Sequence, residues 1–395
     1  MYVNVPNLYF NVQALRVLII PRSIFFSPRS VAIIFMETPY SYYSLLSHAH
    51  LFVIIFLLCY VVTIEASSNN KQISAMYVFG DSTVDPGNNN YIDTAFRSDF
   101  PPYGRDLVNH LPTGRFTNGK LGTDFLASYT GLKELLPPYL DPNLSDNELL
   151  TGVSFASAGS GFDPITPTLG NVIPIPEQLE YFKEYKKRLE GMVGKERTEE
   201  HVNKALFFIS AGTNDYVINY FSLPLRRKSY TTLTYGHFLL QHVKEFVQNL
   251  WREGARKIAV AGLPPMGCLP IVITFSSDNV FHERGCLDKY SAVARDYNMR
   301  LQHELLLMQQ NFSYIDIYGP MANMIQSRQN LGFDEVDRGC CGSGYMEATF
   351  LCNGISKVCS DASKYVFFDS IHPTEKAYYD LFMAARPHID ALING

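Results

Sequence analysis

A histidine with an aspartate three residues before it is the first feature of the chain that suggests acid–base chemistry. Of the ten histidines only His372 has an acidic residue at this spacing, Asp369. In a turn, both side chains can point the same way, so that the carboxylate holds one imidazole nitrogen while the other takes a proton from a nucleophile. An exposed loop aspartate and histidine would share the same spacing, so the pair alone leaves both interpretations open.

The candidate nucleophile is Ser82, in the segment VFGDST at residues 78–83, directly after an apolar run. A serine attacks a carbonyl carbon only when a base removes its proton and donors meet the oxyanion that forms. Gly80 permits a sharp turn before the serine. The segment is not a G-x-S-x-G nucleophile elbow, because Val84 stands at the fifth position, and this disfavours an ordinary α/β-hydrolase.

Two other positions could supply donors for an oxyanion. Asn214, in the turn GTND at residues 212–215, offers a side-chain amide. Gly159, in the segment FASAGSG at residues 155–161, offers an unshielded backbone N–H. Each residue could instead only shape its loop.

The elements that would position these residues alternate between strand-like and helix-like patterns. Apolar runs at Ala75–Gly80, Ala205–Ser210, Lys257–Ala261 and Phe312–Ile317 predict buried strands. Apolar residues recur at helical spacing over residues 239–251 and 290–308, and Pro373 is expected in the first turn of a last helix. This order predicts an α/β fold, a three-layer αβα sandwich with a mainly parallel central sheet. Because ligand sites lie beyond the carboxyl ends of such strands, Ser82 and Asn214 should meet at one rim.

Residues 1–66 are expected to be a leader, and residues 67–395 a single domain without an internal linker. The run Leu51–Val62 is apolar and uncharged, and small residues follow it up to Ala66. Its length fits the core of a signal peptide and falls short of the roughly 20 residues of a transmembrane helix. A start at Met36 would give a signal peptide of about 36–66 and an upstream extension of 1–35. A retained membrane anchor is the alternative.

Composition and charge exclude several classes of protein. The chain has 33 Lys and Arg against 38 Asp and Glu, a net charge of −5, with 47% hydrophobic residues, so it is a folded protein and not a basic nucleic-acid binder. We expect no nucleic-acid partner and no stable membrane anchor after removal of the leader.

Cysteines and sequons fit an oxidising, extracellular location, so we expect a secreted glycoprotein. Without the leader, the cysteines form an even set that can pair completely as disulfides, with the connectivity open. Zinc binding is the alternative, which the adjacent cysteines and the absence of paired C-x-x-C motifs disfavour. Asn143 and Asn311 each begin an N-x-S sequon and are candidate glycosylation sites. The six cysteines are Cys268, Cys286, Cys340, Cys341, Cys352 and Cys359.

Four blocks of this sequence, in this order, resemble the GDSL lipase/esterase family of the SGNH hydrolases, over about residues 75–390. Three longer strings look like the plant branch of that family: DSTVDPGNN at 81–89, PTGRFTNGK at 112–120 and GLPPMGC at 262–268. The four blocks are FGDS at 79–82, the segment around Gly159, GTND at 212–215 and DSIHP at 369–373.

The resemblance implies an SGNH-hydrolase, flavodoxin-like fold and a role for each candidate residue. Ser82 would be the nucleophile, His372 the general base and acid, and Asp369 the group that orients His372. Gly159 and Asn214 would complete the oxyanion hole with the Ser82 N–H. Thr83 replaces the leucine of the family name, and a further glycine at 161 leaves the oxyanion glycine open between Gly159 and Gly161.

The implied activity is that of a secreted esterase or lipase that acts on small-molecule or lipid esters, in lipid metabolism or lipid degradation. An acyltransferase would share the same acyl-enzyme and pass the acyl group to an alcohol. A non-catalytic binding protein is disfavoured, because all five residues are present. Such chemistry requires no metal and no cofactor, and the common nucleotide and zinc motifs are absent from the sequence. Tyr103, Phe116 and Phe162 could line a lipid cleft, although aromatic residues are more often part of a core.

Overall fold

The computed structural model of the chain describes residues 11–12, 15–16, 73–223, 225–276, 284–308, 310–344 and 352–394. The chain divides into two compact units, Met1–Asn70 and Lys71–Gly395. In the first unit, the described residues form an antiparallel pair of short strands, β1 (Asn11–Val12) and β2 (Leu15–Arg16). The rest of the predicted leader lies outside the described residues.

The centre of the second unit is a parallel sheet, as the sequence predicts. Its four strands are adjacent in the order β3 (Met76–Gly80), β4 (Leu206–Ser210), β5 (Lys257–Ala261) and β6 (Phe312–Ile315). The register pairs Gly80 with Ser210, so β3 and β4 end side by side. Parallel strands with crossover helices are buried on both faces, which explains why these runs are almost continuously apolar.

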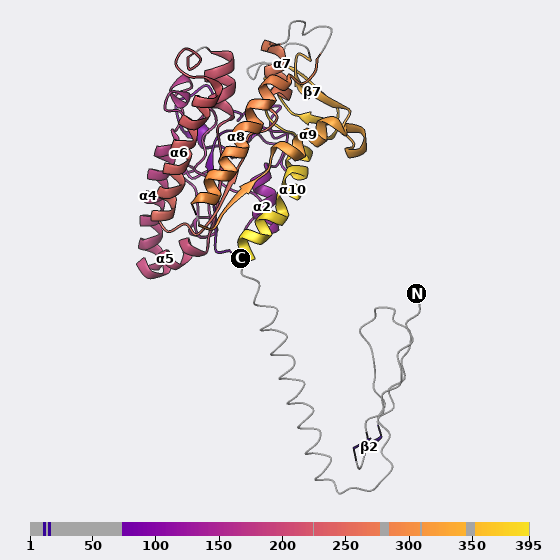
Figure 1. Cartoon of the computed structure of the whole chain (residues 1–395). Coiled ribbons are helices and arrows are strands. Elements are labelled where there is room, and N and C mark those ends of the chain that lie inside the picture. Colours follow the sequence, from indigo (N-terminus) through magenta and orange to yellow (C-terminus); the bar gives the residue numbers. More distant parts are fainter. Residues whose placement is uncertain are drawn as a thin grey trace. The chain divides into compact units, whose positions relative to one another are not determined.

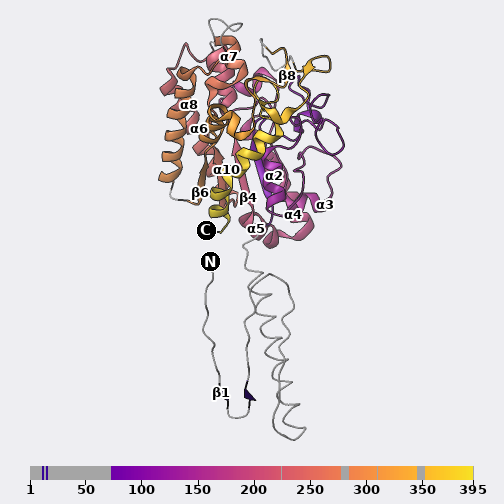
Figure 2. The same ribbon diagram turned by 90° about the vertical axis from the view of Figure 1, so that its right-hand side faces the viewer.

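Helices cover both faces of this sheet and complete three layers (Figure 1). Alternate side chains of each strand point to opposite faces. Tyr77 and Phe79 belong to a core cluster with residues of α4 (Ile175–Val193), α6 (Thr232–Arg252) and α8 (Asp288–Leu307). Met76 and Val78 belong to a second cluster with residues of α2 (Gly122–Tyr129) and α10 (Glu375–Asn394), the helices in front of the sheet in Figure 2. The predicted αβα sandwich is therefore confirmed.

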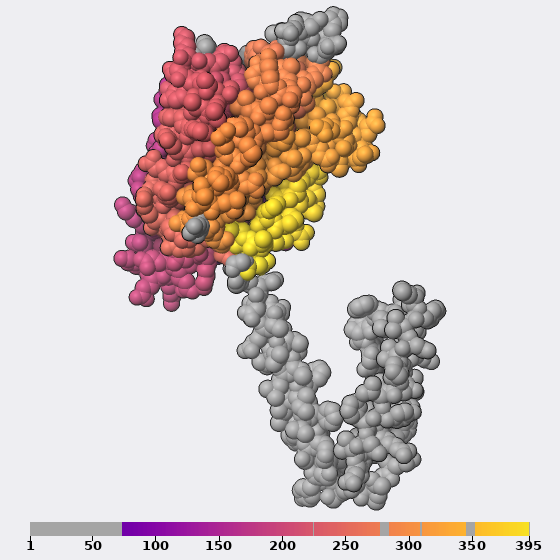
Figure 3. Space-filling model, viewed as in Figure 1, coloured from indigo at the N-terminus to yellow at the C-terminus, as the bar shows by residue number. Residues whose placement is uncertain are grey.

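The remaining described elements lie in the connections between these layers. In the space-filling view, α8 in orange and α10 in yellow form much of the visible surface (Figure 3). The remaining helices are α3 (Asp146–Thr151), α5 (Lys195–Lys204), α7 (Pro270–Ser276) and α9 (Tyr318–Gln326). The remaining strands are β7 (Glu335–Gly339) parallel to β10 (Tyr365–Phe367), and β8 (Cys341–Gly342) antiparallel to β9 (Lys357–Val358). Short turns of 3₁₀ helix are η1 (Asn88–Tyr91), η2 (Thr166–Leu169), η4 (Met266–Cys268), η5 (Arg328–Leu331) and η7 (Ala362–Lys364), and η3 (Asp215–Ser222) is a π-helix.

The start of the last helix differs from the sequence prediction. We expected Pro373 in its first turn, but α10 begins at Glu375 and Pro373 forms an isolated bridge with Phe367. Thr374 precedes the helix, and its hydroxyl accepts a hydrogen bond from the Ala377 N–H at 3.3 Å. A threonine cap satisfies an N–H that the first turn leaves without a partner. Pro373 therefore lies outside the helix, in the turn that carries His372.

All six cysteines form disulfides, which is one of the two alternatives that the sequence left open. The pairs are Cys268–Cys286, Cys340–Cys359 and Cys341–Cys352. Among the described residues, no helix is both long and apolar enough to cross a bilayer.

Candidate active site

The position of Ser82 follows from the glycine that ends β3. Gly80 has φ of +139°, and a Cβ atom there would lie 1.8 Å from the carbonyl oxygen of Ser210. Only glycine can pass so close to the end of β4. The chain turns out of the sheet at this point, the Asp81 N–H donates to the Ser210 carbonyl at 3.0 Å, and Ser82 lies at the carboxyl-end rim of the sheet.

Ser82, His372 and Asp369 form a continuous hydrogen-bonded chain. The Ser82 Oγ lies 2.7 Å from Nε2 of His372. Nδ1 of His372 lies 2.7 Å from Oδ2 of Asp369 and 2.9 Å from its Oδ1. Since an ionised carboxylate only accepts, Nδ1 carries the proton and Nε2 is left to accept from the serine hydroxyl. The structure thus joins two residues 290 positions apart in the sequence.

Asp369 is buried and held by several donors. Oδ1 accepts from the backbone N–H groups of Ile371 and His372, each at 2.8 Å, and Oδ2 accepts from the hydroxyl of Tyr103 at 2.8 Å. Burial by itself raises the pKa of Asp369, but the charge of His372 and the hydrogen bonds from His372 and Ile371 outweigh it and hold the pKa below its usual range. The carboxyl group is therefore ionised at neutral pH and orients the imidazole.

Aromatic side chains surround Asp369 and His372. The ring of Phe116 lies 4.8 Å from the imidazole of His372, centre to centre. Burial, followed by the Asp369 carboxylate, raises the pKa of Tyr103 well above its usual value, so the phenol stays protonated and donates. Tyr103 and Phe116 belong to a small cluster with Phe368, and Phe162 lies in the main core. Of the three aromatic residues that could have lined a lipid cleft, Tyr103 therefore contacts Asp369 and Phe116 contacts His372.

The segment that carries Gly159 packs against the turn of Ser82. The Ser157 N–H and the Ser160 hydroxyl both donate to the Gly80 carbonyl, at 3.0 and 2.8 Å. The side chain of Asn214 donates to the Ser160 carbonyl at 3.0 Å. An amide NH₂ group has two N–H donors, and this bond uses one of them and fixes the orientation of the group. The structure therefore brings Gly159, Asn214 and Ser82 into one rim.

Gly159 and Gly161 differ in what requires a glycine. Gly159 has φ of +88°, a conformation that glycine adopts most readily. A Cβ atom at Gly161 would instead lie 2.2 Å from Oδ1 of Asp215. Asp215 is buried and accepts from the backbone N–H groups of Phe162 and Asp163 and from the hydroxyl of Thr166. Packing against Asp215 thus explains Gly161, the positive φ explains Gly159, and the role of Gly159 as the oxyanion glycine stays a prediction.

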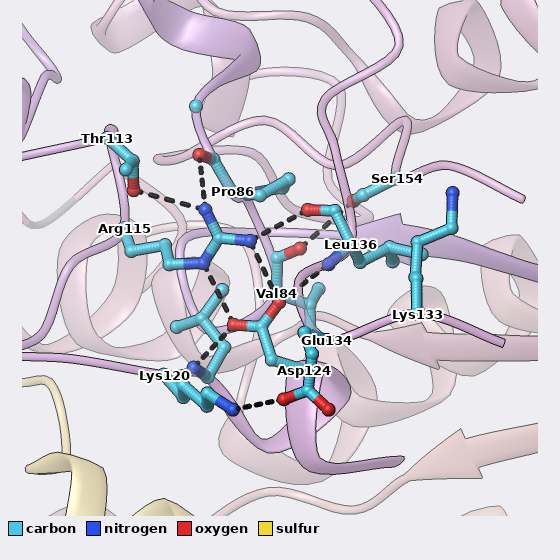
Figure 4. Close-up of polar contacts among 12 residues, drawn as sticks. Val84, Pro86, Thr113, Arg115, Lys120, Asp124, Lys133, Glu134, Leu136 and Ser154 are labelled. Atoms are coloured by element: carbon cyan, nitrogen blue, oxygen red, sulfur yellow. Dashed lines mark hydrogen bonds and ion pairs between the residues drawn. The ribbon is translucent and has the colours of Figure 1, made fainter. Parts of the chain in front are cut away.

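Arg115, in the PTGRFTNGK string of residues 112–120, forms a buried ion pair with Asp124 near the loop of residues 83–87, which follows Ser82 and is called the nucleophile loop after the predicted role of that serine (Figure 4). Arg115 donates to both oxygens of Asp124 at 2.8 Å, and both side chains are almost completely buried. Arg115 also donates to the carbonyl of Pro86, at 3.3 Å, in the loop that follows Ser82. Asp124 accepts further hydrogen bonds from the N–H groups of Leu121 and Leu136. The pair therefore connects the start of α2 with the nucleophile loop.

Several supporting residues were missed in the sequence analysis. Gln178 in α4 accepts from the Gly80 N–H at 2.9 Å and donates to the Gly80 carbonyl at 2.9 Å, so it clamps the end of β3. Asp85 accepts from the Ala158 N–H at 2.9 Å and so joins the nucleophile loop to the Gly159 segment. Neither residue follows a spacing rule; Asp85 lies in the DSTVDPGNN string, but its burial is visible only in the structure.

Both candidate glycosylation residues are accessible. The side chains of Asn143 and Asn311 are exposed, in the loop before α3 and directly before β6 respectively. Exposure is a requirement for glycan attachment, and the sites remain predictions.

The fold and this geometry define a class of protein: an α/β protein with a Ser–His–Asp arrangement at the carboxyl ends of its strands, suited to acyl-group chemistry. Residues 76–385 match the model of the GDSL-like lipase/acylhydrolase family. The chain belongs to this family.

Curated relatives agree with the family match. The chain is 59% identical to a GDSL esterase/lipase of Arabidopsis thaliana over 329 residues, which is 82% of this chain and 88% of the relative. It is 43% identical to a second Arabidopsis GDSL esterase/lipase over 326 residues, covering 81% of this chain and 90% of that one. The protein is accordingly a carboxylic ester hydrolase of the esterase/lipase type.

Solved structures show a more distant likeness. A catalytic mutant of Axe2, an acetylxylan esterase from Geobacillus stearothermophilus, is 14% identical, with 80% of this chain and 94% of that chain covered and a TM-score of 0.34. This likeness is too distant to carry any inference about the substrate.

Proposed function

We propose that the protein is a secreted serine hydrolase that cleaves acyl esters through an acyl-enzyme on Ser82. The observation that carries this proposal is the hydrogen-bonded chain from the Ser82 Oγ through both nitrogens of His372 to Asp369. The three side chains are at most 7% exposed, so the proton moves between groups that are largely shielded from water. An imidazole held in this way can accept a proton on one nitrogen while its other N–H stays bonded to the carboxylate.

In the first half of the reaction, the Ser82 Oγ bonds to the carbonyl carbon of the ester while its proton passes to Nε2 of His372. The carbonyl oxygen becomes an oxyanion, for which the Ser82 N–H, the Gly159 N–H and the Asn214 amide are the proposed donors. As the tetrahedral intermediate collapses, the bond from carbon to the alcohol oxygen breaks. His372 returns its proton to that oxygen, so the alcohol leaves and the acyl group stays on Ser82.

In the second half, water takes the place of the alcohol. His372 removes a proton from the water molecule, its oxygen bonds to the acyl carbon, and the bond to Ser82 Oγ breaks as Oγ regains a proton. Asp369 keeps its negative charge throughout and stabilises the imidazolium that forms twice in the cycle.

Hydrolysis of p-nitrophenyl acetate and butyrate by the purified protein tests this proposal. We expect activity in the wild type and its loss in Ser82→Ala, with both folds confirmed by circular dichroism. Ser98→Ala is a matched control, because Ser98 is also buried and its hydroxyl has no hydrogen-bond partner among the described residues. Equal activity in the wild type and Ser82→Ala would refute Ser82 as the nucleophile.

Transfer to an alcohol is the second outcome of the same acyl-enzyme. Product analysis with and without glycerol distinguishes it from hydrolysis. We expect free acid as the main product in both cases, whereas a predominance of acyl glycerol would assign the protein to the acyltransferases.

The proposal of secretion is supported by the three disulfides and the two exposed sequons. Expression of the full chain in plant cells, with analysis of the culture medium, tests it. We expect a secreted protein that begins near residue 67 and loses mass when its N-glycans are removed. Retention of the intact chain in the membrane fraction would support the alternative of an anchor.

A further inference from the structure

An apolar cavity of about 100 Å³ lies on the α2 and α10 face of the central sheet. Phe208 and Ser210 of β4 line its floor, and Leu381 and Ala385 of α10 line its roof. Phe208 and Ser210 are only partly buried, although β4 lies between two other strands. Protein cores rarely contain voids larger than a water molecule, so a hollow over a central strand requires an explanation.

The cavity reaches the rim where the candidate catalytic residues lie. Thr83 directly follows Ser82, Thr213 directly precedes Asn214, and Ile371 directly precedes His372, and all three line the cavity. The hydroxyl of Thr83 is hydrogen-bonded to the hydroxyl of Ser210 at 2.9 Å, which marks where the floor of the cavity meets the turn of Ser82. The lining thus includes the sequence neighbours of Ser82, Asn214 and His372 at the rim, together with residues of α10.

The part of the lining from α2 and α10 consists mostly of hydrocarbon side chains. Leu126 of α2 and Ala385 and Ile389 of α10 line the cavity there and belong to the second core cluster. Tyr378, also in the lining, has a buried hydroxyl without a hydrogen-bond partner among the described residues. The walls are mostly hydrocarbon, and the hydroxyl groups among them are few: those of Thr83, Thr123, Ser210, Thr213 and Tyr378. Such a lining suits an alkyl chain attached to a polar group better than a sugar or an ion.

We infer that this cavity holds the acyl chain of the ester, an inference that rests on the proposed function of Ser82. Its volume is smaller than the roughly 150 Å³ of an apolar cavity that binds benzene, a molecule of six carbons. By proportion, the cavity accommodates an alkyl segment of roughly four carbons. The structure thus assigns a preference for short acyl chains, and longer chains fit only if Leu381 or its neighbours move.

The kcat/KM values for p-nitrophenyl acetate, butyrate and octanoate test this assignment. We expect the wild type to prefer butyrate to acetate by about tenfold, the effect of burying two more methylene groups. Ala385→Leu should remove this preference, because the larger side chain fills the space under α10 that the two additional methylene groups of butyrate would occupy. Leu381→Ala should raise the ratio of octanoate to butyrate by about tenfold, because it enlarges the cavity.

Leu240→Ala is the matched control for the enlarging substitution. Leu240 lies in α6, is 4% exposed against 6% for Leu381, and is not among the residues that line the cavity. We expect its chain-length profile to equal that of the wild type. If Ala385→Leu does not fold, Leu381→Ala and Leu240→Ala decide the question by themselves.

Two results separate failure of this inference from failure of the proposed function. If the folded variants all keep the wild-type chain-length profile, the cavity is only a packing defect and the inference is wrong, while Ser82 stands as the nucleophile. If the folded wild type hydrolyses none of the three esters, the proposed function itself fails, and the acyl-chain pocket fails with it.

Discussion

At the scale of single residues, the chemistry depends on how the carboxylate of Asp369 is held. Its two oxygens accept from Tyr103, from His372 and from two backbone N–H groups. These bonds keep the group ionised and fix which nitrogen of His372 faces Ser82. The spacing of Asp369 and His372 was visible in the sequence, whereas the donor from Tyr103, 266 positions away, was not.

Tyr103→Phe tests this support, because it removes one hydroxyl and keeps the aromatic ring. A hydrogen bond to a charged group contributes about 1.5 to 3 kcal/mol. We expect kcat to fall roughly tenfold, equivalent to about 1.4 kcal/mol, with KM little changed, because Tyr103 acts through Asp369 and does not contact the ester. The acidic limb of the kcat/KM profile should move to higher pH, since the carboxylate loses a donor. Wild-type kcat and an unmoved limb would show that Tyr103 only packs against Phe368.

Asn214→Ala tests the proposed oxyanion donor. Removal of one such donor costs about 2.7 to 4 kcal/mol, so kcat should fall roughly 100- to 1000-fold while KM changes little. Steady-state kinetics with p-nitrophenyl butyrate measures the effect. A decrease below threefold would mean that the amide only holds the Ser160 carbonyl.

At the scale of elements, contacts between distant segments hold the rim in place. Arg115 and Asp124 link the start of α2 to the nucleophile loop, and Gln178 in α4 holds the end of β3. The packing of these elements also includes the cavity under α10, which lowers the stability of the fold because atoms are missing there. At about 24 cal/mol per Å³, a cavity of 100 Å³ costs roughly 2.4 kcal/mol of stability. A persistent cost of this size is consistent with a binding pocket.

Arg115→Ala measures the contribution of the buried pair. It leaves the carboxylate of Asp124 buried without its partner, so the free energy of unfolding should fall by about 3 to 5 kcal/mol in urea titrations. Lys183→Ala, which breaks the exposed pair with Glu180, is the control and should change it by less than about 0.5 kcal/mol. Similar losses in the two variants would show that burial of the Arg115 pair has no special importance.

The strands, the main helices and the three layers could be predicted from the sequence, because hydrophobic periodicity is a local signal. Ser82 and Asn214 could be placed at one rim because each follows an apolar run that forms a strand. The supports from Tyr103, Gln178 and Arg115 could not, since they join segments that are distant in sequence and have no spacing rule. The cap of α10 by Thr374 was missed because Pro373 gave the stronger local signal.

At the scale of the whole molecule, stability is linked to pH through buried carboxyl groups. Burial raises the pKa of Asp215 to about 7, against the effect of its bonds from Thr166, Phe162 and Asp163, and the charge of Asp163 raises it further. In the unfolded chain an aspartate has a pKa of about 3.9. Between these values the folded state binds more protons than the unfolded state, so Asp215 makes the protein less stable as the pH rises.

Urea unfolding at pH 6 and pH 8 tests this linkage. The pKa of about 7 predicts that the contribution of Asp215 to the free energy of unfolding decreases by about 1.4 kcal/mol between these pH values. Asp215→Asn removes the ionisable group. From pH 6 to pH 8, the difference in free energy of unfolding between this variant and the wild type should therefore shift in favour of the variant by about 1.4 kcal/mol. The same pH dependence in both proteins would mean that Asp215 is already ionised at pH 6.

The central claim, an acyl-enzyme on Ser82, is tested most directly by labelling the folded protein with a fluorophosphonate. Such a reagent phosphonylates only a serine that an adjacent base has activated, and intact-mass analysis counts the groups added. We predict one added group on the wild type, mapped to Ser82 by peptide sequencing, and none on Ser82→Ala or His372→Ala. No adduct on the folded wild type, or an adduct that persists in Ser82→Ala, would contradict the account.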